Sequence, residues 1–470
     1  MTVDTKDTET RLSLHPLVWI LCLASLSVAA RNFEMGLSSD GPIYSTIGRN
    51  IARTGNWFYL DGNVPDFKPF VDHPHLGYWF LGSVFKMLPA ADWSARIVGH
   101  VFYVLFLWLL FAFISNLSGK KVAVWTVVIL WGWSRFSNPF SNVYVDPGAL
   151  FFGSAVLFLI DDYFRNERHW LTPLLAGVSL SLCIMIKGLT VLGFVPVMGV
   201  IPLLHWSNRR LLSKGLLKNL GIFLASSMAV LFFYWVSVKL SDVPDFFEVY
   251  WSRQIENRFS RVWSFSNLLD PTFWRLLLRD TYYLAPLSLL ALFRVKERRF
   301  LLVPFLWSLS FIVMYGVNLR HGMQYWLPIM PGIAWLLADG IFRFIPLKCE
   351  KLVKGTAFLS VAALFLIQYF PMRTHGMAPT ELESIHYPSI PGNPVDVLWM
   401  DGTPTYTDFI NSSRFAWWGD VEVKYVKTEE SIPLATKNTG FLIFWPGARS
   451  LRERELAEKK LVPLPRGSPK

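Results

Sequence analysis

Long apolar stretches, separated by short basic loops, run through most of this 470-residue chain. Because a helix needs roughly 20 apolar residues to cross a bilayer, we predict a polytopic bundle of about eleven membrane spans. The predicted spans lie near residues 12–30, 96–115, 121–137, 143–160, 170–186, 188–206, 216–238, 281–293, 299–317, 323–342 and 353–371. The fold is therefore predicted to be mainly α-helical.

The composition agrees with a membrane protein. Only 17% of the residues are charged and 53% are hydrophobic, whereas a soluble domain has roughly a quarter of its residues charged. The formal net charge of +11 is explained largely by cations in the loops, and basic nucleic-acid motifs are missing, so no nucleic-acid partner is expected. The three cysteines have no metal-ligand spacing, and we predict no disulfide framework.

The basic loops also set the orientation. With the N-terminus in the cytoplasm, the inner loops are 118–121, 165–169, 208–218, 294–299 and 348–354, and each of them is basic. The stretch 12–30 ends in "SVAA", which imitates a signal-peptidase site, but Asp4, Asp7 and Glu9 make a poor n-region. We therefore expect an uncleaved first span, and we expect the loops 31–95 and 239–280 and the C-terminal tail outside the cytoplasm.

Two parts of the chain differ from the spans. In the first outer loop, Ile43, Ile47 and Ile51 recur at helical spacing, which predicts an amphipathic interfacial helix, and residues 76–88 predict another interfacial or re-entrant helix. The tail predicts short strands and one helix, at 395–400, 414–418, 421–426, 440–445 and 450–461. We therefore divide the chain into a membrane module, 1–371, and a small extracytoplasmic α/β domain, 372–470.

Charged residues recur at the outer ends of the predicted spans. Asp40 stands in "LSSDGPIYSTIGRN" and Asp146 in "NVYVDPGALFF", each near a proline at a predicted helix start. Capping explains either acid alone, since aspartate is a favoured N-cap and proline fits the first turn. However, Lys187 interrupts the apolar run on the same side, and a lysine there is costly unless it reaches water or an anion. The three residues together predict a site, although a snorkelling lysine remains the alternative.

Further outer residues are candidates for the same site. Arg253, Arg258 and Arg261 lie in the loop 239–280, either to serve an anionic ligand or as a solvated helix beside lipid phosphate. Arg320 and His321 lie at another outer helix end. The first outer loop adds Asp72 and His73, which are residue types that can hold a divalent metal.

These segments, taken in order, resemble a known family. "DGPIYSTIGRNIARTGNWF", "DHPHLGYWFLGSVFKML", "VYVDPGALFF", "KGLTVLGFVPV" and "RHGMQYWLPIMP" are similar to segments of the GT-C membrane glycosyltransferases, specifically the protein O-mannosyltransferases and lipid A aminoarabinose transferase. The resemblance covers roughly three-quarters of the chain, in family order and with matching topology, and rests on the ordered set rather than on one motif. It implies a GT-C fold and transfer of a hexosyl or pentosyl group from a polyprenyl-phosphate carrier.

The resemblance also implies roles for individual residues. Asp40 matches the first-loop catalytic acid and Asp146 the second acid, while Lys187, Arg320 and His321 match positions near the carrier phosphate. The chain departs from the family at Gly41, where relatives often carry a second acid. It departs again at residues 72–75, where bacterial relatives often read Glu-Lys-Pro-Pro, so that His73 stands where a phosphate-binding lysine is expected.

These residues support a mechanistic hypothesis. Asp40 deprotonates an acceptor hydroxyl, which attacks the anomeric carbon with inversion, while Lys187, Arg320 and an arginine such as Arg258 stabilise the departing phosphate. The acceptor is a lipid, a protein or an envelope glycan, and the expected location is the bacterial inner membrane. Two alternatives remain: a lipid or glycan transporter or flippase, and a non-catalytic envelope assembly protein. Convergence of Asp40, Asp146 and Lys187 around one outward cavity would favour the enzyme.

Overall fold

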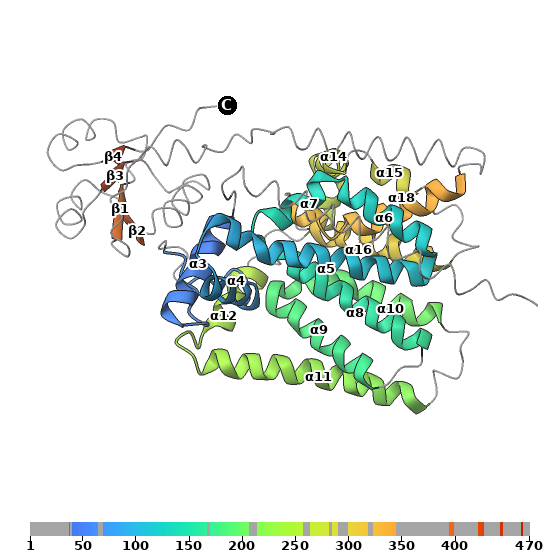
Figure 1. Ribbon diagram of the computed structural model, residues 1–470, viewed down its shortest axis with the longest axis horizontal. Helices are drawn as coiled ribbons and strands as arrows, with labels where there is room; N and C mark the ends of the chain where they lie inside the picture. Colours follow the sequence, from blue (N-terminus) through green and yellow to red (C-terminus); the bar gives the residue numbers. More distant parts are fainter. Residues whose placement is uncertain are drawn as a thin grey trace, which may run out of the picture.

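The computed structural model describes thirteen parts of the chain, namely residues 37, 40–63, 69–166, 170–205, 214–256, 264–281, 284–289, 299–317, 323–344, 394–398, 422–426, 442–444 and 462–463. Most of these residues form a bundle of helices that run side by side (Figure 1). The main members are α5 (Asp92–Ser118), α6 (Lys120–Trp131), α8 (Asp146–Asn166), α9 (Leu171–Lys187), α10 (Val195–Leu204), α11 (Lys214–Lys239), α16 (Leu302–Val317) and α18 (Met330–Phe344). The predicted, mainly α-helical bundle is therefore confirmed.

Within the described residues, five apolar segments are long enough to cross a membrane. They are Asp92–Ser118, Asp146–Asn166, Leu171–Leu204, Gly215–Lys239 and Arg299–Val317, and a shorter apolar helix covers Met330–Ile341. The predicted spans 12–30 and 353–371 lie outside the described residues, and only 281 and 284–289 of the span predicted at 281–293 are described. The total of about eleven spans therefore stays a prediction.

The 34-residue segment Leu171–Leu204 is folded back on itself rather than straight. Lys187, at the end of α9, contacts Asp146 at the start of α8, whereas His205, just after α10, contacts Asp161 near the end of α8. The chain reverses at Gly188, whose φ of 52° lies in the left-handed region that favours glycine. The 3-10 helix η2 (Gly188–Phe194) and α10 then run alongside α8. This reversal agrees with the two spans predicted at 170–186 and 188–206.

One predicted span is broken. Residues 121–137 were expected to form a continuous helix, but α6 ends at Trp131 and α7 (Ser134–Ser141) begins after Gly132 and Trp133. The Trp133 ring is buried, and its Nε1 donates to the backbone oxygen of Asp280 at 3.2 Å. This contact joins residues far apart in the sequence, so the apolar pattern of 121–137 contains no sign of the break.

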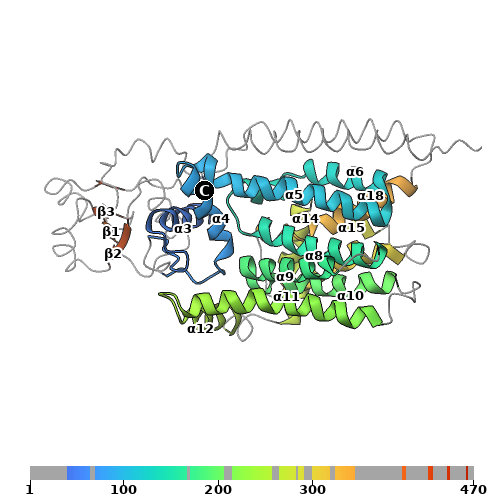
Figure 2. The same ribbon diagram turned by 60° about the horizontal axis from the view of Figure 1, so that its bottom comes forward.

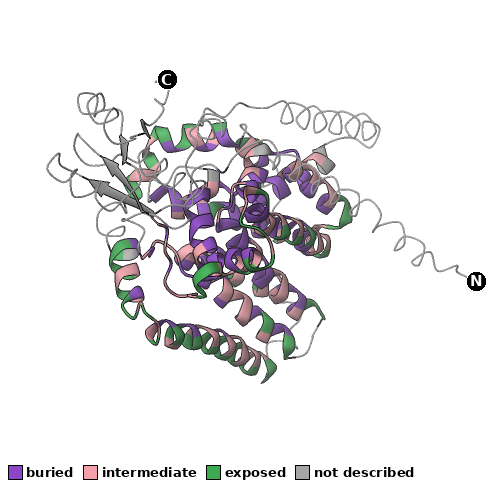
Figure 3. Cartoon of the chain, turned by 60° about the vertical axis from the view of Figure 1, so that its left-hand side comes forward, coloured by how far each residue is buried: buried purple, intermediate pink, exposed green. Residues whose placement is uncertain are grey.

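Helix α11 lies at the edge of the bundle. Only 17% of its membrane-crossing window is buried, and exposed and intermediate residues follow its length (Figure 3). On its inner side, the Ser181 hydroxyl of α9 donates to the backbone oxygen of Ser227 at 2.9 Å. Small polar side chains allow helices in membranes to approach closely and to bond across the interface, which explains how a helix with so little buried surface is held.

Helices α3 (Gly41–Thr54) and α4 (Leu76–Met87) lie at one end of the bundle, together with α12 (Phe246–Tyr250), in both views (Figures 1 and 2). Both helices were predicted. Ile43, Ile47 and Ile51 are buried, and Ile51 packs against Gly82 of α4. The apolar face of α3 therefore covers another helix, and the prediction that it lies on the lipid interface is wrong for this face.

Four short strands form a parallel sheet in the order β2-β1-β3-β4. They are β1 (Pro394–Leu398), β2 (Glu422–Val426), β3 (Leu442–Phe444) and β4 (Val462–Pro463). The strands predicted at 395–400, 421–426 and 440–445 coincide with β1, β2 and β3. The strand predicted at 414–418 and the helix at 450–461 lie outside the described residues, and a separate domain over 372–470 stays a prediction.

Because α3 and α4 are in close contact, adding one methyl group between them should change the stability of the fold measurably. A Cβ at Gly48 would lie 2.6 Å from the Cβ of Leu81, so we expect Gly48→Ala to destabilise the fold by about 1–3 kcal/mol. A Cβ at Gly199 of α10 would have nothing within 4 Å, so Gly199→Ala is the matched control and should be neutral or stabilising. The apparent melting temperature in detergent measures both. Equal melting temperatures for the two variants would contradict this packing.

Candidate functional site

A buried ion pair joins α8 to α9 at the end of the bundle that carries α3 and α4. Lys187 Nζ contacts Asp146 Oδ1, and their side chains are only 9% and 6% exposed. Lys187 Nζ also lies 5.2 Å from the centre of the Tyr325 ring, in the short helix α17 (Met323–Trp326). The two residues that the sequence placed on one face are therefore in direct contact, and Asp146 is the first residue of α8 rather than its cap.

Helices α3 and α4 both begin against the segment that leads into Asp146. A Cβ at Gly41 would lie 2.7 Å from the backbone oxygen of Asn142, and one at Gly77 would lie 2.7 Å from Cγ1 of Val145. Residue 41 therefore has no room for a side chain, which explains why this chain lacks a second acid after Asp40. Val143 holds a φ of 58°, which is strained for a β-branched side chain, so tertiary packing must fix this segment.

Asp40 directs its side chain toward Tyr44 rather than toward the helix backbone. Its backbone oxygen accepts from the Tyr44 N–H, but its carboxylate makes no capping bond, so the prediction that Asp40 caps α3 with its side chain is wrong. Instead, the Tyr44 hydroxyl lies 3.5 Å from Asp40 Oδ2 and 3.2 Å from His73 Nε2. Asp40, Tyr44 and His73 thus form one polar chain.

Two buried tyrosines, Tyr44 and Tyr78 of α4, pack against each other beside Asp40, with their ring centres 5.4 Å apart. Burial, and next the charge of Asp40, raise the pKa of Tyr44 well above its usual value, and the charge of Asp146 also acts on this hydroxyl. Burial likewise raises the pKa of Tyr78, followed by the charges of Asp72, Asp40 and Asp146. Both hydroxyls therefore stay protonated.

Asp72 and His73, the residues predicted to hold a metal, have polar partners in the structure. Asp72 Oδ1 accepts a hydrogen bond from Gln254 Nε2 at 2.5 Å, while His73 Nε2 contacts the Tyr44 hydroxyl. No group of three His, Cys, Asp or Glu side chains among the described residues has the arrangement of a metal site. A metal at Asp72 and His73 stays a prediction, and we derive no chemistry from it.

His75 has a structural role beside the site. Its Nε2 donates to the backbone oxygen of Phe58 at 2.9 Å, which leaves Nδ1 to accept from the Tyr234 hydroxyl of α11 at 2.6 Å. The ring is completely buried and lies 4.3 Å from the Phe246 ring of α12. Burial lowers the pKa of His75 to about 4, so the ring is neutral near pH 7.

The structure describes some of the predicted outer cations and not others. Arg253 is described and exposed, on the π-helix η4 (Trp251–Glu256). Arg258, Arg261, Arg320 and His321 lie outside the described residues, so their proximity to Lys187 stays a prediction. Arg279, in α14 (Pro271–Asp280), contacts the buried carboxylate of Asp280 at 2.9 Å.

A small apolar cavity lies next to the ion pair. It is lined by side chains and glycines of α4, α5, α8 and the end of α9, including Gly77, Val98, Phe102, Gly148 and Ile186. Val145 and Ile186, the neighbours of Asp146 and Lys187 in sequence, both line it. The polar pair therefore borders an apolar space between the helices.

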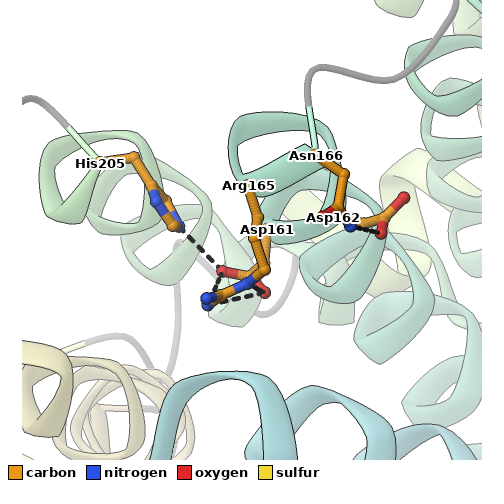
Figure 4. A network of polar contacts seen from close by, with 5 residues as sticks. All are labelled: Asp161, Asp162, Arg165, Asn166 and His205. Atoms are coloured by element: carbon orange, nitrogen blue, oxygen red, sulfur yellow. Dashed lines mark hydrogen bonds and ion pairs between the residues drawn. The ribbon is translucent and has the colours of Figure 1, made fainter. Parts of the chain in front are cut away.

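A second polar network occupies the opposite end of α8 (Figure 4). The completely buried carboxylate of Asp161 lies 2.9 Å from His205 Nε2 and 3.3 Å from an Arg165 nitrogen. Asp162 accepts from the Asn166 amide at 2.6 Å. Sequence analysis missed this network, together with Tyr44, Tyr78 and Tyr325. Only the spacing of Asp161 and Arg165, four residues apart on one helix, could have indicated part of it.

Comparison with known proteins gives the class of this fold. Residues 72–235 match the family model of dolichyl-phosphate-mannose-protein mannosyltransferases. The structure is similar to ArnT from Cupriavidus metallidurans bound to undecaprenyl phosphate, with 16% identity and a TM-score of 0.58 over 73% of this chain and 63% of that one. It is also similar to the archaeal oligosaccharyltransferase AglB from Archaeoglobus fulgidus in complex with an inhibitory peptide and a dolichol-phosphate.

This chain and AglB share 11% sequence identity, and their structures match with a TM-score of 0.54 over 88% of this chain and 64% of AglB. The chain thus spans 63–64% of the length of these two proteins. No curated protein matches it. The chain is an integral membrane protein with the GT-C fold. Its resemblance to the protein O-mannosyltransferases and to lipid A aminoarabinose transferase is confirmed.

The buried pair predicts a strong dependence of stability on both partners. Lys187→Met leaves the Asp146 carboxylate without its cation and should cost roughly 3–5 kcal/mol, and adding Asp146→Asn should restore part of that loss. Lys239→Met is the control, because it breaks a pair with Glu248 whose side chains are 28% and 61% exposed, and it should cost far less than Lys187→Met. Melting temperatures of these variants and of the single variant Asp146→Asn measure the effects. Strictly additive losses in the double variant would contradict the pairing.

Burial of neutral His75 predicts a pH effect on stability. Unfolding lets the ring bind a proton below its ordinary pKa of 6.5, whereas the folded chain resists protonation down to about 4. This contribution to stability is therefore complete above pH 6.5 and is lost progressively toward pH 4. Melting temperature should fall more steeply over this range in the natural chain than in His75→Gln, and identical slopes would contradict the account.

Proposed function

We propose that this chain is a membrane glycosyltransferase, which transfers a sugar from a polyprenyl-phosphate carrier to an extracytoplasmic hydroxyl with inversion. The observation that carries the proposal is the buried contact between Asp146 and Lys187, at the same end of an apolar bundle as Asp40 and its partner Tyr44. The GT-C fold and the match at residues 72–235 support it. So does the undecaprenyl phosphate bound to ArnT from C. metallidurans.

In this mechanism Asp40 is the general base. As the acceptor oxygen attacks the anomeric carbon, the acceptor proton moves to the Asp40 carboxylate, and the bond between that carbon and the phosphate oxygen breaks with its electron pair on the phosphate. Tyr44 lies between Asp40 and His73, within reach of both, and its protonated hydroxyl orients the carboxylate. The Asp40 carboxylate makes no capping bond to the helix backbone, so capping does not compete with this role.

Lys187 stabilises the departing phosphate. A fixed cation is most effective in a site shielded from water, and the Lys187 side chain is only 9% exposed. Asp146, which contacts Lys187 in the chain without ligand, binds the donor or acceptor sugar or shares the role of the base. The predicted cations Arg320, His321, Arg258 and His73 complete the phosphate environment in this proposal.

We further propose that the chain lies in the bacterial inner membrane with its N-terminus in the cytoplasm. The Asp146–Lys187 pair is then outside, whereas the Asp161–His205 contact, at the other end of α8, is on the cytoplasmic side. The acceptor is a lipid, a protein or an envelope glycan. Positioning of the acids at outer helix ends favours transfer over transport, since transporters usually hold substrates near the membrane midplane.

The proposal is tested by complementing a deletion strain with the natural chain or with Asp40→Asn. Mass spectrometry of envelope glycolipids and glycoproteins identifies the sugar that depends on the chain, and its rate of appearance in isolated membranes is then measured. Loss of a general base should reduce this rate about 10²-fold or more. Asp245→Asn is the matched control, because Asp245 also occupies an N-cap position without a side-chain capping bond and is exposed.

Near-normal transfer by Asp40→Asn would eliminate Asp40 as the base. A deletion strain whose envelope glycans are unchanged, but in which a lipid or glycan accumulates on one side of the membrane, would instead support the transporter alternative. A phenotype that Asp40→Asn, Asp146→Asn and Lys187→Gln all complement fully would support the non-catalytic assembly protein.

A further inference from the structure

The cation that the proposed mechanism assigns to the carrier phosphate already has an anionic partner. Lys187 and Asp146 are both nearly buried and in direct contact, so the pair carries no net charge. A neutral pair attracts a phosphate weakly, because the attraction to the ammonium is offset by repulsion from the carboxylate. Asp146 therefore weakens the attraction between Lys187 and a phosphate for as long as it stays on the ammonium group.

We propose that Asp146 is an internal competitor of the carrier phosphate, which enters the site by replacing the Asp146 carboxylate on Lys187. This inference rests on the proposed function and adds a specific exchange of partners to it. In the chain without ligand, Asp146 compensates the charge of Lys187. In the chain with the released carrier, the phosphate does so.

In this proposal the displaced Asp146 carboxylate moves toward the hydroxyls of Tyr78 and Tyr315, because the single hydroxyl proton of Tyr44 is donated to Asp40. The charge of Asp146 acts on the hydroxyls of Tyr44, Tyr78 and Tyr315, which come from α3, α4 and α16. All three rings are buried, with exposed fractions of 6% or less. Neutral donors can satisfy a buried carboxylate that has lost its cation. Lys187 meanwhile keeps its position over the Tyr325 ring. The face of this ring attracts the ammonium group before and after the exchange of anions.

The competition changes during the proposed reaction. The carrier-linked sugar donor is a phosphodiester with one negative charge. When the bond to the anomeric carbon breaks, the electron pair stays on the phosphate oxygen and the carrier gains a second charge. Asp146 therefore competes well against the donor and poorly against the departing phosphate. An interaction that becomes stronger as the reaction proceeds lowers the barrier more than one that is equally strong at the start.

The exchange makes an unusual prediction: removing a charged side chain from the site should strengthen ligand binding. We expect Asp146→Asn to bind undecaprenyl phosphate at least about fivefold more tightly than the natural chain, the lower end of typical coupling between sites. Lys187→Gln should weaken binding, and in that background Asp146→Asn should produce little further change. Affinities are measured on the full purified chain in detergent, with undecaprenol as the uncharged probe.

Asp161→Asn is the matched control. It makes the same change in the same helix, also to a buried carboxylate with a cationic neighbour, but at the opposite end of α8 (Figure 4). It should leave the affinity for undecaprenyl phosphate unchanged. A similar gain in both variants would mean that the effect is a general loosening of the bundle, which would overturn the proposal.

The outcomes separate this inference from the proposed function. If the natural chain binds undecaprenyl phosphate no better than undecaprenol, the carrier in the proposed function is wrong. If it binds the phosphate selectively but Asp146→Asn binds it equally or more weakly, the exchange is wrong while the function stands. Should Asp146→Asn not fold, Lys187→Arg provides the test. A guanidinium can hold a carboxylate and a phosphate together, so affinity should rise, and an unchanged affinity would overturn the exchange.

Discussion

The buried ion pair between Asp146 and Lys187 is the interaction on which the arrangement of this site depends. It closes one end of the hairpin in which the chain runs through α9, reverses at Gly188 and returns beside α8. Removing two charges from water is costly, and the pair is maintained because each charge compensates the other. The same property makes it responsive, since a third charge entering this space changes which partners are favourable.

The rest of this end of the bundle is arranged around the pair. Gly41 and Gly77 let α3 and α4 begin directly against residues 142–145, which brings Asp40 and the tyrosines Tyr44 and Tyr78 toward Asp146. At the opposite end, Asp161 and His205 hold α8 to the end of α10. Helix α8 is thus attached at both ends to the segment that carries Lys187, and the spacing of the two contacts fixes the register of the site.

Much of this arrangement follows from the sequence because apolar length and loop charge have simple physical consequences. They predicted most of the helices, the reversal near Lys187, and a site containing Asp40, Asp146 and Lys187. The two errors have different sources. The Asp40 carboxylate contacts the hydroxyl of Tyr44, four residues further along the chain, instead of capping the helix backbone. The helix predicted over 121–137 ends at Trp131, and the buried Trp133 that follows contacts Asp280, which is far away in the sequence. The tyrosines have no charge pattern that distinguishes them from core residues.

The central claim is that Lys187, in contact with Asp146, holds the phosphate of a lipid carrier. An experimental structure of the full chain with undecaprenyl phosphate tests it most directly. We predict the phosphate within hydrogen-bonding distance of Lys187 Nζ, with the Asp146 carboxylate moved toward the hydroxyls of Tyr78 or Tyr315. A phosphate bound elsewhere, with the Asp146–Lys187 pair intact, would contradict it.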